Sequence, residues 1–294
     1  MHHRDREKQR LAMTSNTSNQ SLVNQERRLG ALRATLAQYD LLAIAISGGV
    51  DSTTLAAVAH DVLGERALMV HATSPAVPPD ATKRVQHSAS SFGWNLKIVD
   101  AGEFSDEQYR QNPVNRCYYC KSNLYHRIHE VWGGTVASGA NLDDLGDYRP
   151  GLLAASEKQV VHPLIDAGID KATVRIIATG LGLESVADLP AQPCLSSRIE
   201  TGIAIDAGDL MFVHKVETLL ANRLGRGDIR CRITAAGVRI EVDDELQRVN
   251  EDAWQKVCIE VTHMIIDSNR MLAGFTGYER GSAFLKASEH NQHE

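Results

Sequence analysis

The stretch Leu41-Leu42-Ala43-Ile44-Ala45-Ile46-Ser47-Gly48-Gly49-Val50-Asp51-Ser52 decides the fold of this chain. Its apolar first half predicts a buried strand, and a helical pattern follows the glycines directly. Glycines let a backbone approach a phosphate because they carry no Cβ. The first N–H groups of a helix lack partners within it, and the helix dipole favours negative charge there. The stretch therefore predicts a phosphate-binding turn.

The polar side chains of this turn fit the same interpretation. The hydroxyls of Ser47 and Ser52 add hydrogen-bond donors, and the carboxylate of Asp51 is suited to hold Mg²⁺ beside phosphates. The turn has neither the Gly-Lys-Ser/Thr ending of the kinase-type P-loop nor the Gly-x-Gly-x-x-Gly pattern. It resembles the SGGxDS loop of the ATP pyrophosphatases, the PP-loop superfamily. Those enzymes cleave ATP between its α and β phosphates to activate a substrate as an adenylate, so we expect Ser47, Gly48, Gly49, Asp51 and Ser52 to bind ATP and magnesium.

Composition and charge limit the class of protein. The chain has 294 residues, 43% of them hydrophobic and 23% charged, which is typical of a soluble globular protein with one large or two ordinary domains. No apolar run approaches the roughly 20 residues of a membrane span, and residues 1–10 lack the apolar region of a signal peptide. We therefore expect a cytoplasmic protein with no membrane partner. The net charge of −6 argues against nucleic acid as its main partner.

Strand and helix patterns alternate over the first two thirds of the chain. Strands are predicted at 41–46, 67–72, 96–99, 135–138 and 160–161, and helices at 52–63, 78–92, 117–132 and 171–181. This alternation predicts an α/β fold, in which a parallel twisted sheet carries helices on both faces. Ligands of such sheets bind at the carboxyl ends of the strands, which is where the Ser47 turn falls.

The pattern changes after Arg198. A long amphipathic helix is predicted first, then two strands, helical patterns and a last strand, over 209–224, 229–233, 238–242, 243–272 and 274–281. We therefore expect a smaller α+β domain at the C-terminal end. The predicted organisation is a disordered tail (1–20), a PP-loop domain (21–199) and a domain for substrate binding or oligomerisation (200–287).

The five cysteines argue for metal binding or catalysis rather than for disulfides in a cytoplasmic chain. Cys117 and Cys120 form a C-x-x-C pair, and Cys194 lies at the presumed domain junction. A structural zinc site usually needs two such pairs, so histidine would have to complete it. Alternatively, three thiolates hold an iron–sulfur cluster, or a thiolate itself carries sulfur to the substrate. Cys231 and Cys258 lie in apolar patterns and are interpreted as core residues.

Further stretches of the chain resemble the LarE family of ATP-dependent sulfur transferases. They are NPVNRCYYCK at 112–121, SGANLDDLGDYRPG at 138–151 and PCLSSRI at 193–199. The segments RCR at 230–232 and RIE at 239–241 are similar to the arginine-rich strand pair of that family. With the Ser47 loop, these matches keep the same order from about residue 40 to residue 242.

The resemblance implies a role in building the nickel-pincer nucleotide cofactor of lactate racemase-type enzymes. LarE-like proteins use ATP to adenylate a carboxylate of pyridinium-3,5-biscarboxylic acid mononucleotide, and sulfur then displaces AMP to leave a thiocarboxylate. Adenylation turns the oxygen of a poor electrophile into a good leaving group, and thiolate or sulfide is a strong nucleophile. The alternatives are a tRNA thiolase, an ammonia-dependent synthetase of the same superfamily, or a zinc-stabilised nucleotide-binding regulator.

The resemblance also implies the site residues, cofactors and partners. Family members with three cysteines resemble a type in which an open iron of a [4Fe-4S] cluster carries sulfur, whereas members with one cysteine give up its own sulfur. Cys117, Cys120 and Cys194 therefore favour the cluster, beside ATP and Mg²⁺. We expect a small-molecule nucleotide substrate and a homo-oligomer such as a hexamer. Nucleotide binding is further expected of Thr73, Ser74, Gly139 and Asn141, and substrate binding of Asp143, Asp144, Arg198, Arg230, Arg232, Arg239 and Glu241.

Overall fold

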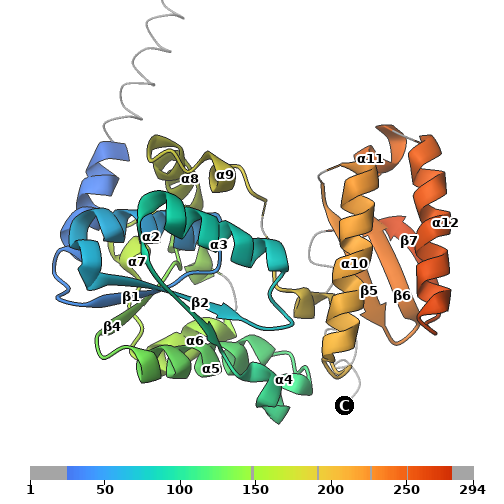
Figure 1. The fold of residues 1–294 in the computed structure, drawn as a ribbon, viewed down its shortest axis with the longest axis horizontal. Helices are drawn as coiled ribbons and strands as arrows, with labels where there is room; N and C mark the ends of the chain where they lie inside the picture. Colours follow the sequence, from blue (N-terminus) through green and yellow to red (C-terminus); the bar gives the residue numbers. More distant parts are fainter. Residues whose placement is uncertain (1–24, 147–148, 191, 226, 250, 280–294) are drawn as a thin grey trace, which may run out of the picture. The chain divides into compact units, whose positions relative to one another are not determined.

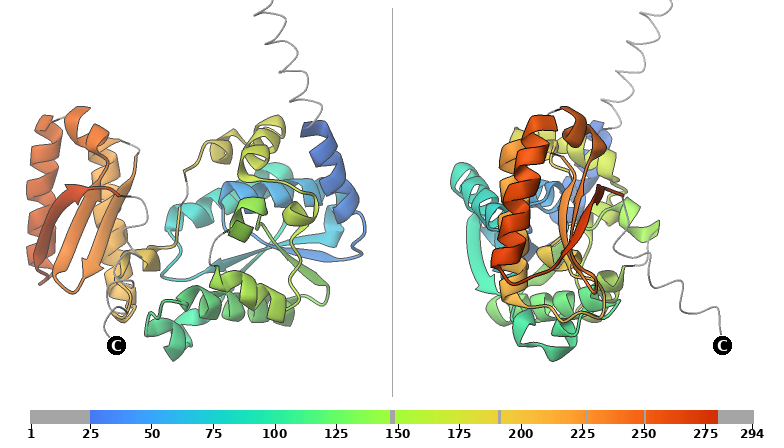
Figure 2. Two further views of the ribbon diagram at one scale, coloured as in Figure 1. Left: turned by 180° about the vertical axis from the view of Figure 1, so that it is seen from behind. Right: turned by 90° about the vertical axis from the view of Figure 1, so that its right-hand side faces the viewer.

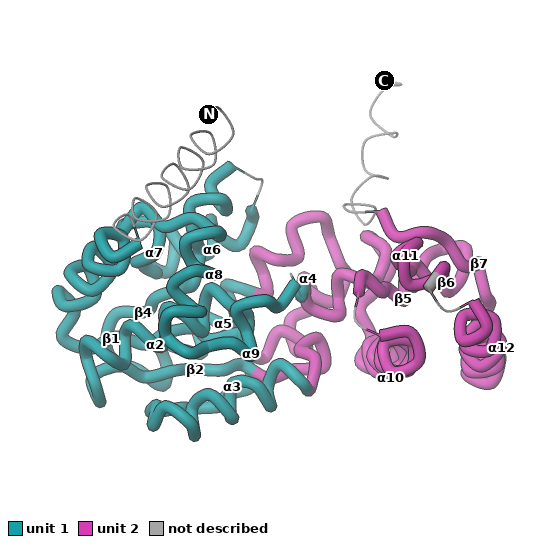
Figure 3. The backbone as a smooth tube through the Cα atoms, turned by 90° about the horizontal axis from the view of Figure 1, so that it is seen from above, with its two compact units in different colours: residues 1–72, 80–101, 121–192 teal, residues 73–79, 102–120, 193–294 magenta. Residues whose placement is uncertain are grey.

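The fold is described from a computed structural model, which covers residues 25–146, 149–190, 192–225, 227–249 and 251–279. The predicted tail at 1–20 and the last residues of the third predicted domain lie outside the described residues. The chain divides into two compact units that are interleaved in sequence (Figure 3). Unit 1 comprises residues 1–72, 80–101 and 121–192, and unit 2 comprises residues 73–79, 102–120 and 193–294.

A four-stranded sheet forms the centre of unit 1. Its strands are β1 (Leu42–Ala45), β2 (Ala67–Thr73), β3 (Asn95–Asp100) and β4 (Thr135–Ser138), in the order β3-β2-β1-β4. Strand β1 pairs in parallel with both β2 and β4. The predicted parallel sheet is therefore confirmed, and β1 delivers the Ser47 turn to its carboxyl edge, between the two neighbouring strands.

Helices cover both faces of this sheet (Figures 1 and 2). Because side chains alternate along a strand, β1 contributes Leu42 and Ile44 to one core and Ala43 to another. The first core includes residues of helix 25–36 and of helices α2 (Val50–Leu63), α3 (Pro79–Phe92) and α8 (Lys171–Gly180). The second core includes residues of α5 (Arg116–Val131) and α6 (Pro150–Glu157). This arrangement confirms the predicted α/β class.

The predicted fifth strand at 160–161 is reduced to one bridge between Val161 and Ala137. Two neighbours explain why it does not extend. Gln159 has a positive φ of 56°, and Pro163, which has no N–H to donate to a ladder, begins the short helix α7 (Pro163–Asp166).

Unit 2 contains a separate mixed sheet. Strands β5 (Ile229–Thr234) and β6 (Gly237–Val242) are antiparallel, and β7 (Leu272–Gly277) pairs with β6 in parallel. Its helices are α10 (Ala207–Leu224), α11 (Asp244–Val249) and α12 (Glu251–Asp267). The predicted order of a helix, two strands, helices and a last strand is confirmed. Apolar side chains of α10, α12 and the sheet form one buried core.

Early segments of the chain join unit 2 through long-range contacts. The side chain of Asn112 is fully buried and donates to the carbonyls of Glu200 (2.9 Å) and Ile203 (3.0 Å). The main-chain carbonyl of Asn112 accepts from the N–H of Gly202 at 3.0 Å. Segment 102–120, which contains the short helix α4 (Glu107–Arg110), is thereby fixed to the loop that precedes α10. The predicted domain boundary at residue 199 stays a prediction.

The remaining short elements are α9 (Glu184–Ala187) and the 3-10 turns η1 (Gly64–Arg66), η2 (Glu103–Ser105), η3 (Leu142–Gly146) and η4 (Leu195–Arg198). Among the residues that the structure describes, no helix is both long and apolar enough to cross a membrane.

Candidate functional site

The turn between β1 and α2 has the backbone that its glycines predict. Gly48 has a φ of +79°, a conformation that favours glycine. A Cβ on Gly48 would lie 2.8 Å from the carbonyl oxygen of Ala81 in α3, so the close packing of turn and helix also excludes other residues. Arg84 of the same helix donates to the carbonyl of Gly48 at 3.3 Å. Helix α3 therefore holds the turn in place.

The N-terminus of α2 has no side-chain cap, and its N-cap residue is Gly49. The two serines of the motif hold the turn instead: their hydroxyls lie 3.1 Å apart, and Ser52 Oγ accepts from the N–H of Ser47 at 3.1 Å. Ser52 is buried and Ser47 is exposed. Unpaired N–H groups at a helix N-terminus favour a phosphate group.

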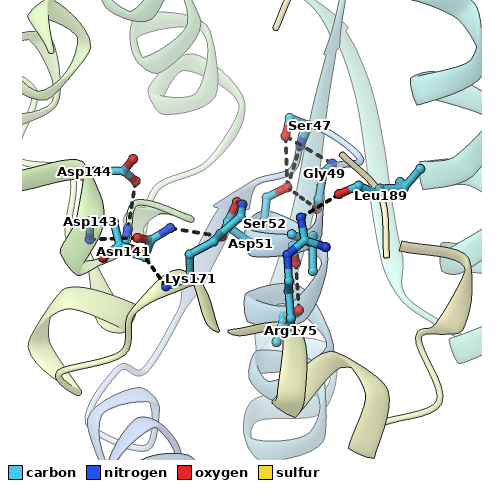
Figure 4. Close-up of polar contacts among 12 residues, drawn as sticks. Ser47, Gly49, Asp51, Ser52, Asn141, Asp143, Asp144, Lys171, Arg175 and Leu189 are labelled. Atoms are coloured by element: carbon cyan, nitrogen blue, oxygen red, sulfur yellow. Dashed lines mark hydrogen bonds and ion pairs between the residues drawn. The ribbon is translucent and has the colours of Figure 1, made fainter. Parts of the chain in front are cut away.

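Asp51 lies in the first turn of α2 and is held from both sides (Figure 4). The side-chain amide of Asn141 donates to Asp51 Oδ1 at 3.0 Å. The ammonium of Lys171, the first residue of α8, pairs with Asp51 Oδ2. The side chains of Asp51 and Lys171 remain 23% and 35% exposed, so this carboxylate is accessible at the carboxyl edge of the sheet.

The loop after β4 supports this arrangement. Asn141 Oδ1 accepts from the N–H of Asp143 at 3.0 Å, and Asp143 Oδ2 accepts from the N–H of Lys171 at 3.0 Å. Asp144 accepts from the N–H of Asn141 at 3.0 Å and pairs with Arg149 at 2.9 Å. Asp143 and Asp144, for which substrate binding is predicted, thus also organise the loop that carries Asn141.

Gly139 allows the loop after β4 to contact the N-terminus of α2. A Cβ on Gly139 would lie 2.7 Å from the amide nitrogen of Ser52 and 2.8 Å from its Cα. Any side chain there would push the loop away from the turn. Gly139 and Asn141, two of the predicted nucleotide-binding residues, therefore lie against the N-terminus of α2, next to the Ser47 turn.

Lys171 is a residue beside Asp51 that no sequence pattern predicted. No motif contains this lysine, and its separation of 120 residues from Asp51 hides the contact. One signal could have found it: Asp170, whose side chain accepts from the N–H of Thr173 at 2.8 Å, is an N-cap residue, and it marks the start of a helix near the sheet edge. A lysine in that first turn is unusual because the helix dipole disfavours positive charge there.

Thr73 ends β2, and Ser74 follows it. The hydroxyl of Ser74 accepts from the N–H of Ala76 at 3.2 Å, and its carbonyl accepts from the N–H of Val77 at 3.0 Å. Ser74 therefore makes the turn that closes the strand. Nucleotide binding by Thr73 and Ser74 stays a prediction.

The cysteines of the predicted sulfur site belong to unit 2. Cys117 is exposed and Cys120 half-buried, and both lie in the first turns of α5, three residues apart and hence on one side of the helix. Cys194 is exposed and is the N-cap residue of η4. Cys231 is buried in the core of unit 2, as predicted, and burial raises its pKa well above the ordinary value.

Tyr109 is an electrostatic neighbour of two of these thiols. Its buried hydroxyl lies 2.6 Å from Ser196 Oγ. Burial is the main cause that raises the pKa of Tyr109, and the nearby Cys194 and Cys120 raise it further. The phenol therefore stays protonated, with both cysteines among its electrostatic neighbours.

Arg198 holds the loop that carries Cys194. Its Nη1 donates to the carbonyls of Pro193 (2.8 Å) and Cys194 (3.3 Å). Its Nε and Nη2 donate to the two carboxylate oxygens of Glu217 in α10, at 2.9 and 3.0 Å. Glu217 also accepts from the N–H of Cys231 in β5 at 2.9 Å. Arg198 thus ties the cysteine loop to the helix and sheet of unit 2.

The predicted arginine-rich strand pair gathers around one carboxylate. Glu241 is buried, and it accepts from Arg232 Nε at 2.6 Å and from Arg239 Nε at 3.2 Å. Arg232 and Arg239 are direct partners in the register of β5 and β6. Arg230 instead pairs with Asp228 at 3.2 Å and lies over the ring of Tyr278. Two guanidinium groups therefore share the Glu241 carboxylate.

The side chains of the two sites differ in the metals that they suit. Among the residues that the structure describes, no group of three or more His, Cys, Asp or Glu side chains is placed to hold a metal ion. Magnesium needs no such group, because one or two carboxylates with substrate phosphates and waters suffice, and Asp51 fits that role. A four-iron cluster spaces its thiolate ligands more widely than one ion does, and Cys117, Cys120 and Cys194 have the thiolate chemistry that it requires.

Comparison with protein-family models finds no match. The chain is similar to an uncharacterized protein of Synechocystis, 41% identical over 224 residues, which are 75% of this chain and 83% of that protein. It is 30% identical to the pyridinium-3,5-bisthiocarboxylic acid mononucleotide synthase of Lactiplantibacillus plantarum over 218 residues, 72% of this chain and 78% of the synthase. An uncharacterized protein of Methanocaldococcus jannaschii is 28% identical over 233 residues, 74% of this chain and 88% of that protein.

Proposed function

Because the chain belongs to the LarE family of sulfur transferases, we propose that it is an ATP-dependent, AMP-forming enzyme of nickel-pincer cofactor biosynthesis. Its substrate is pyridinium-3,5-biscarboxylic acid mononucleotide, and each reaction replaces one carboxylate oxygen by sulfur. The observation that carries the proposal is the uncapped N-terminus of α2 beside Asp51, which Asn141 and Lys171 hold at the sheet edge.

The first step is adenylation. A carboxylate oxygen of the substrate attacks the α-phosphorus of ATP, and the bond from that phosphorus to the oxygen bridging the β-phosphorus breaks. Pyrophosphate leaves with the electron pair, and acyl-AMP remains. No proton moves, so the protein must bind and neutralise charge. The N–H groups at the start of α2 and the hydroxyl of Ser47 are suited to bind phosphate oxygens, and Asp51 is suited to ligate Mg²⁺, which would neutralise phosphate charge.

The second step is sulfur transfer. Sulfur attacks the acyl carbon, the carbon–oxygen bond to AMP breaks, and AMP leaves with the electron pair. We assign the sulfur site to Cys117, Cys120 and Cys194. A [4Fe-4S] cluster held by these thiolates would supply the sulfur nucleophile. Arg198 fixes the main chain around Cys194, and the protonated Tyr109 lies near Cys120 and Cys194 without adding a charge.

The substrate carries a phosphate and a second carboxylate, and arginine binds both groups well. We assign them to the guanidinium groups of Arg232 and Arg239, which meet at Glu241, with Arg230 beside them on β5. We also propose that the enzyme works in the cytoplasm as a homo-oligomer.

The test is a reaction of the purified protein with ATP, Mg²⁺ and the biscarboxylic acid mononucleotide. We expect AMP and pyrophosphate in equal amounts, and a product heavier by the mass difference between sulfur and oxygen for each carboxylate converted. Anaerobically purified protein is used, and its iron and sulfide are measured in the same sample. Release of ADP and phosphate, or AMP formation that is independent of the mononucleotide, would contradict the proposal.

A further inference from the structure

We propose that Lys171 is a catalytic residue of this site, which exchanges its ion pair with Asp51 for the pyrophosphate group that leaves ATP. The inference rests on the proposed function, because it takes ATP as the ligand of the Ser47 turn. It adds a residue that lies outside the motif and on a different helix.

The carboxylate of Asp51 already has both oxygens engaged by the protein. Asn141 donates to Oδ1 at 3.0 Å, and the Lys171 ammonium pairs with Oδ2. A divalent cation that ligates Oδ2 would compete directly with the ammonium, since two positive charges repel each other and the oxygen is shared. Lys171 and a bound cation would therefore compete for the same oxygen of Asp51.

The lysine can leave this partner without disturbing the fold. Its anchor is the main chain: the N–H of Lys171 donates to Asp143 at 3.0 Å, and α8 is capped by Asp170. The side chain is 35% exposed and that of Asp51 is 23% exposed. An ion pair that is partly exposed contributes little to stability, so it is exchanged easily for another anion.

Adenylation produces such an anion, because pyrophosphate forms as the acyl-AMP is made. When the bond between the α-phosphorus and the bridging oxygen breaks, its electron pair goes to the bridging oxygen, which becomes part of pyrophosphate. An ammonium beside the N-terminus of α2 can neutralise this growing charge, and lysine binds phosphate as a compact point charge. Asp51 and phosphate thus become alternative acceptors for the same ammonium.

The variant Lys171→Met tests the proposal by two measurements. With saturating ATP and substrate, the single-turnover rate of AMP formation should fall by roughly 100-fold or more, the effect of removing one preorganised charge-stabilising donor. Without nucleotide, Mn²⁺ should bind more tightly to Lys171→Met than to the wild type, by roughly tenfold, because its competitor for Asp51 is gone. Mn²⁺ binding is followed by electron paramagnetic resonance. Lys171→Arg should retain part of the rate.

Lys83→Met is the matched control, since Lys83 forms an exposed ion pair with Asp80 on α3. It should change neither measurement. An unchanged rate of AMP formation in Lys171→Met would overturn the proposal. Weaker Mn²⁺ binding would also overturn it, because it would mean that the lysine only orders Asp51. If the wild type itself forms no AMP, the proposed function fails instead, and the two failures are thereby distinguished.

Discussion

Arg198 and Glu217 form a two-pronged ion pair inside unit 2, with N–O distances of 2.9 and 3.0 Å. Only 6% and 15% of their side chains are exposed. The remaining terminal nitrogen of Arg198 donates to the Pro193 and Cys194 carbonyls and to Ser197 Oγ. We infer that Arg198 acts on the reaction through the position of Cys194, whereas direct substrate binding by Arg198 stays a prediction.

Arg198→Ala should lower the free energy of unfolding by about 3–5 kcal/mol, because it leaves the Glu217 carboxylate buried without its partner. Urea unfolding measures the loss. Arg33→Ala is the control: Arg33 and Asp61 form an exposed pair, and its removal should cost about 0–1 kcal/mol. Equal effects of the two substitutions would show that the Arg198 pair does not hold the loop.

Asp51→Asn should abolish formation of AMP and pyrophosphate while the protein stays folded. The substitution keeps the shape of the side chain and removes the negative charge that the metal requires. AMP release is measured by chromatography, and circular dichroism checks the fold. The exposed Asp61→Asn, on the same helix α2, is the control and should keep full activity. Retained AMP formation in Asp51→Asn would contradict the adenylation mechanism.

The buried His71 leads us to expect that the stability of the protein depends on pH. Its ring is buried in β2, with Nδ1 2.8 Å from the carbonyl of Ile46 and Nε2 2.9 Å from Thr82 Oγ1. A carbonyl only accepts, so Nδ1 donates to Ile46; in the neutral ring Nε2 then accepts from the hydroxyl of Thr82. Burial lowers the pKa of His71, although the hydrogen bond to Ile46 opposes the shift.

Because the pKa of His71 is lowered in the folded protein, the free energy of unfolding should decrease as the pH falls. The unfolded chain binds a proton near the ordinary pKa of about 6.5, whereas the folded protein resists protonation of His71. The stability contributed by the neutral ring is therefore fully present above that pH and declines as the pH falls below it, until the lowered folded pKa is reached. His71→Leu should reduce this slope in unfolding measurements below about pH 6.5.

Sequence patterns were sufficient wherever structure depends on neighbouring residues. The apolar run at 41–46 and the glycines after it predict β1, the Ser47 turn and α2, because burial and backbone freedom are local properties. The strand pair 229–233 and 238–242 was predicted for the same reason. The predicted strand at 160–161 forms only one bridge. Two apolar residues are too few for a strand ladder, and Pro163 begins a helix two residues later.

Contacts between distant residues could not be predicted in this way. Lys171 meets Asp51 across 120 residues, and Tyr109 meets Ser196 across 87. The N-cap residue Asp170 marks the start of α8, but nothing in the sequence pairs Lys171 with Asp51 or Tyr109 with Ser196, because each contact depends on how the chain folds in space. The grouping of segment 102–120 with unit 2 has the same origin, since Asn112 finds its acceptors at Glu200 and Ile203.

Arg239→Gln should weaken binding of the mononucleotide substrate by roughly tenfold or more, since a hydrogen bond to a charged group contributes about 1.5–3 kcal/mol. Arg239 is the better test than Arg232, because its side chain is 31% exposed and Glu241 keeps Arg232 as a partner. Calorimetry measures the affinity, and ATP binding should not change. Arg248→Gln, at an exposed position, is the control. Weaker ATP binding would assign the strand pair to the nucleotide instead.

The last prediction concerns the source of sulfur. If Cys117, Cys120 and Cys194 hold a cluster, anaerobically purified protein should contain iron and sulfide, and alanine at any of the three positions should remove both. Thiocarboxylate formation should stop in each variant, while AMP and pyrophosphate still form from ATP, since adenylation needs no thiol. Cys231→Ala is the control for cysteine loss, because Cys231 is buried in the core of unit 2 and should affect stability alone.

The three single variants also separate the cluster from a sacrificial cysteine. A cluster requires all of its thiolates, so the three variants should fail alike. A sacrificial route requires one residue, so activity that survives Cys117→Ala and is lost in Cys194→Ala would contradict the cluster. In that case the wild type would react once per chain, and Cys194 would lose the mass of hydrogen sulfide and become dehydroalanine. Mass spectrometry of the spent protein distinguishes the two, because a cluster-bearing enzyme keeps all five cysteines.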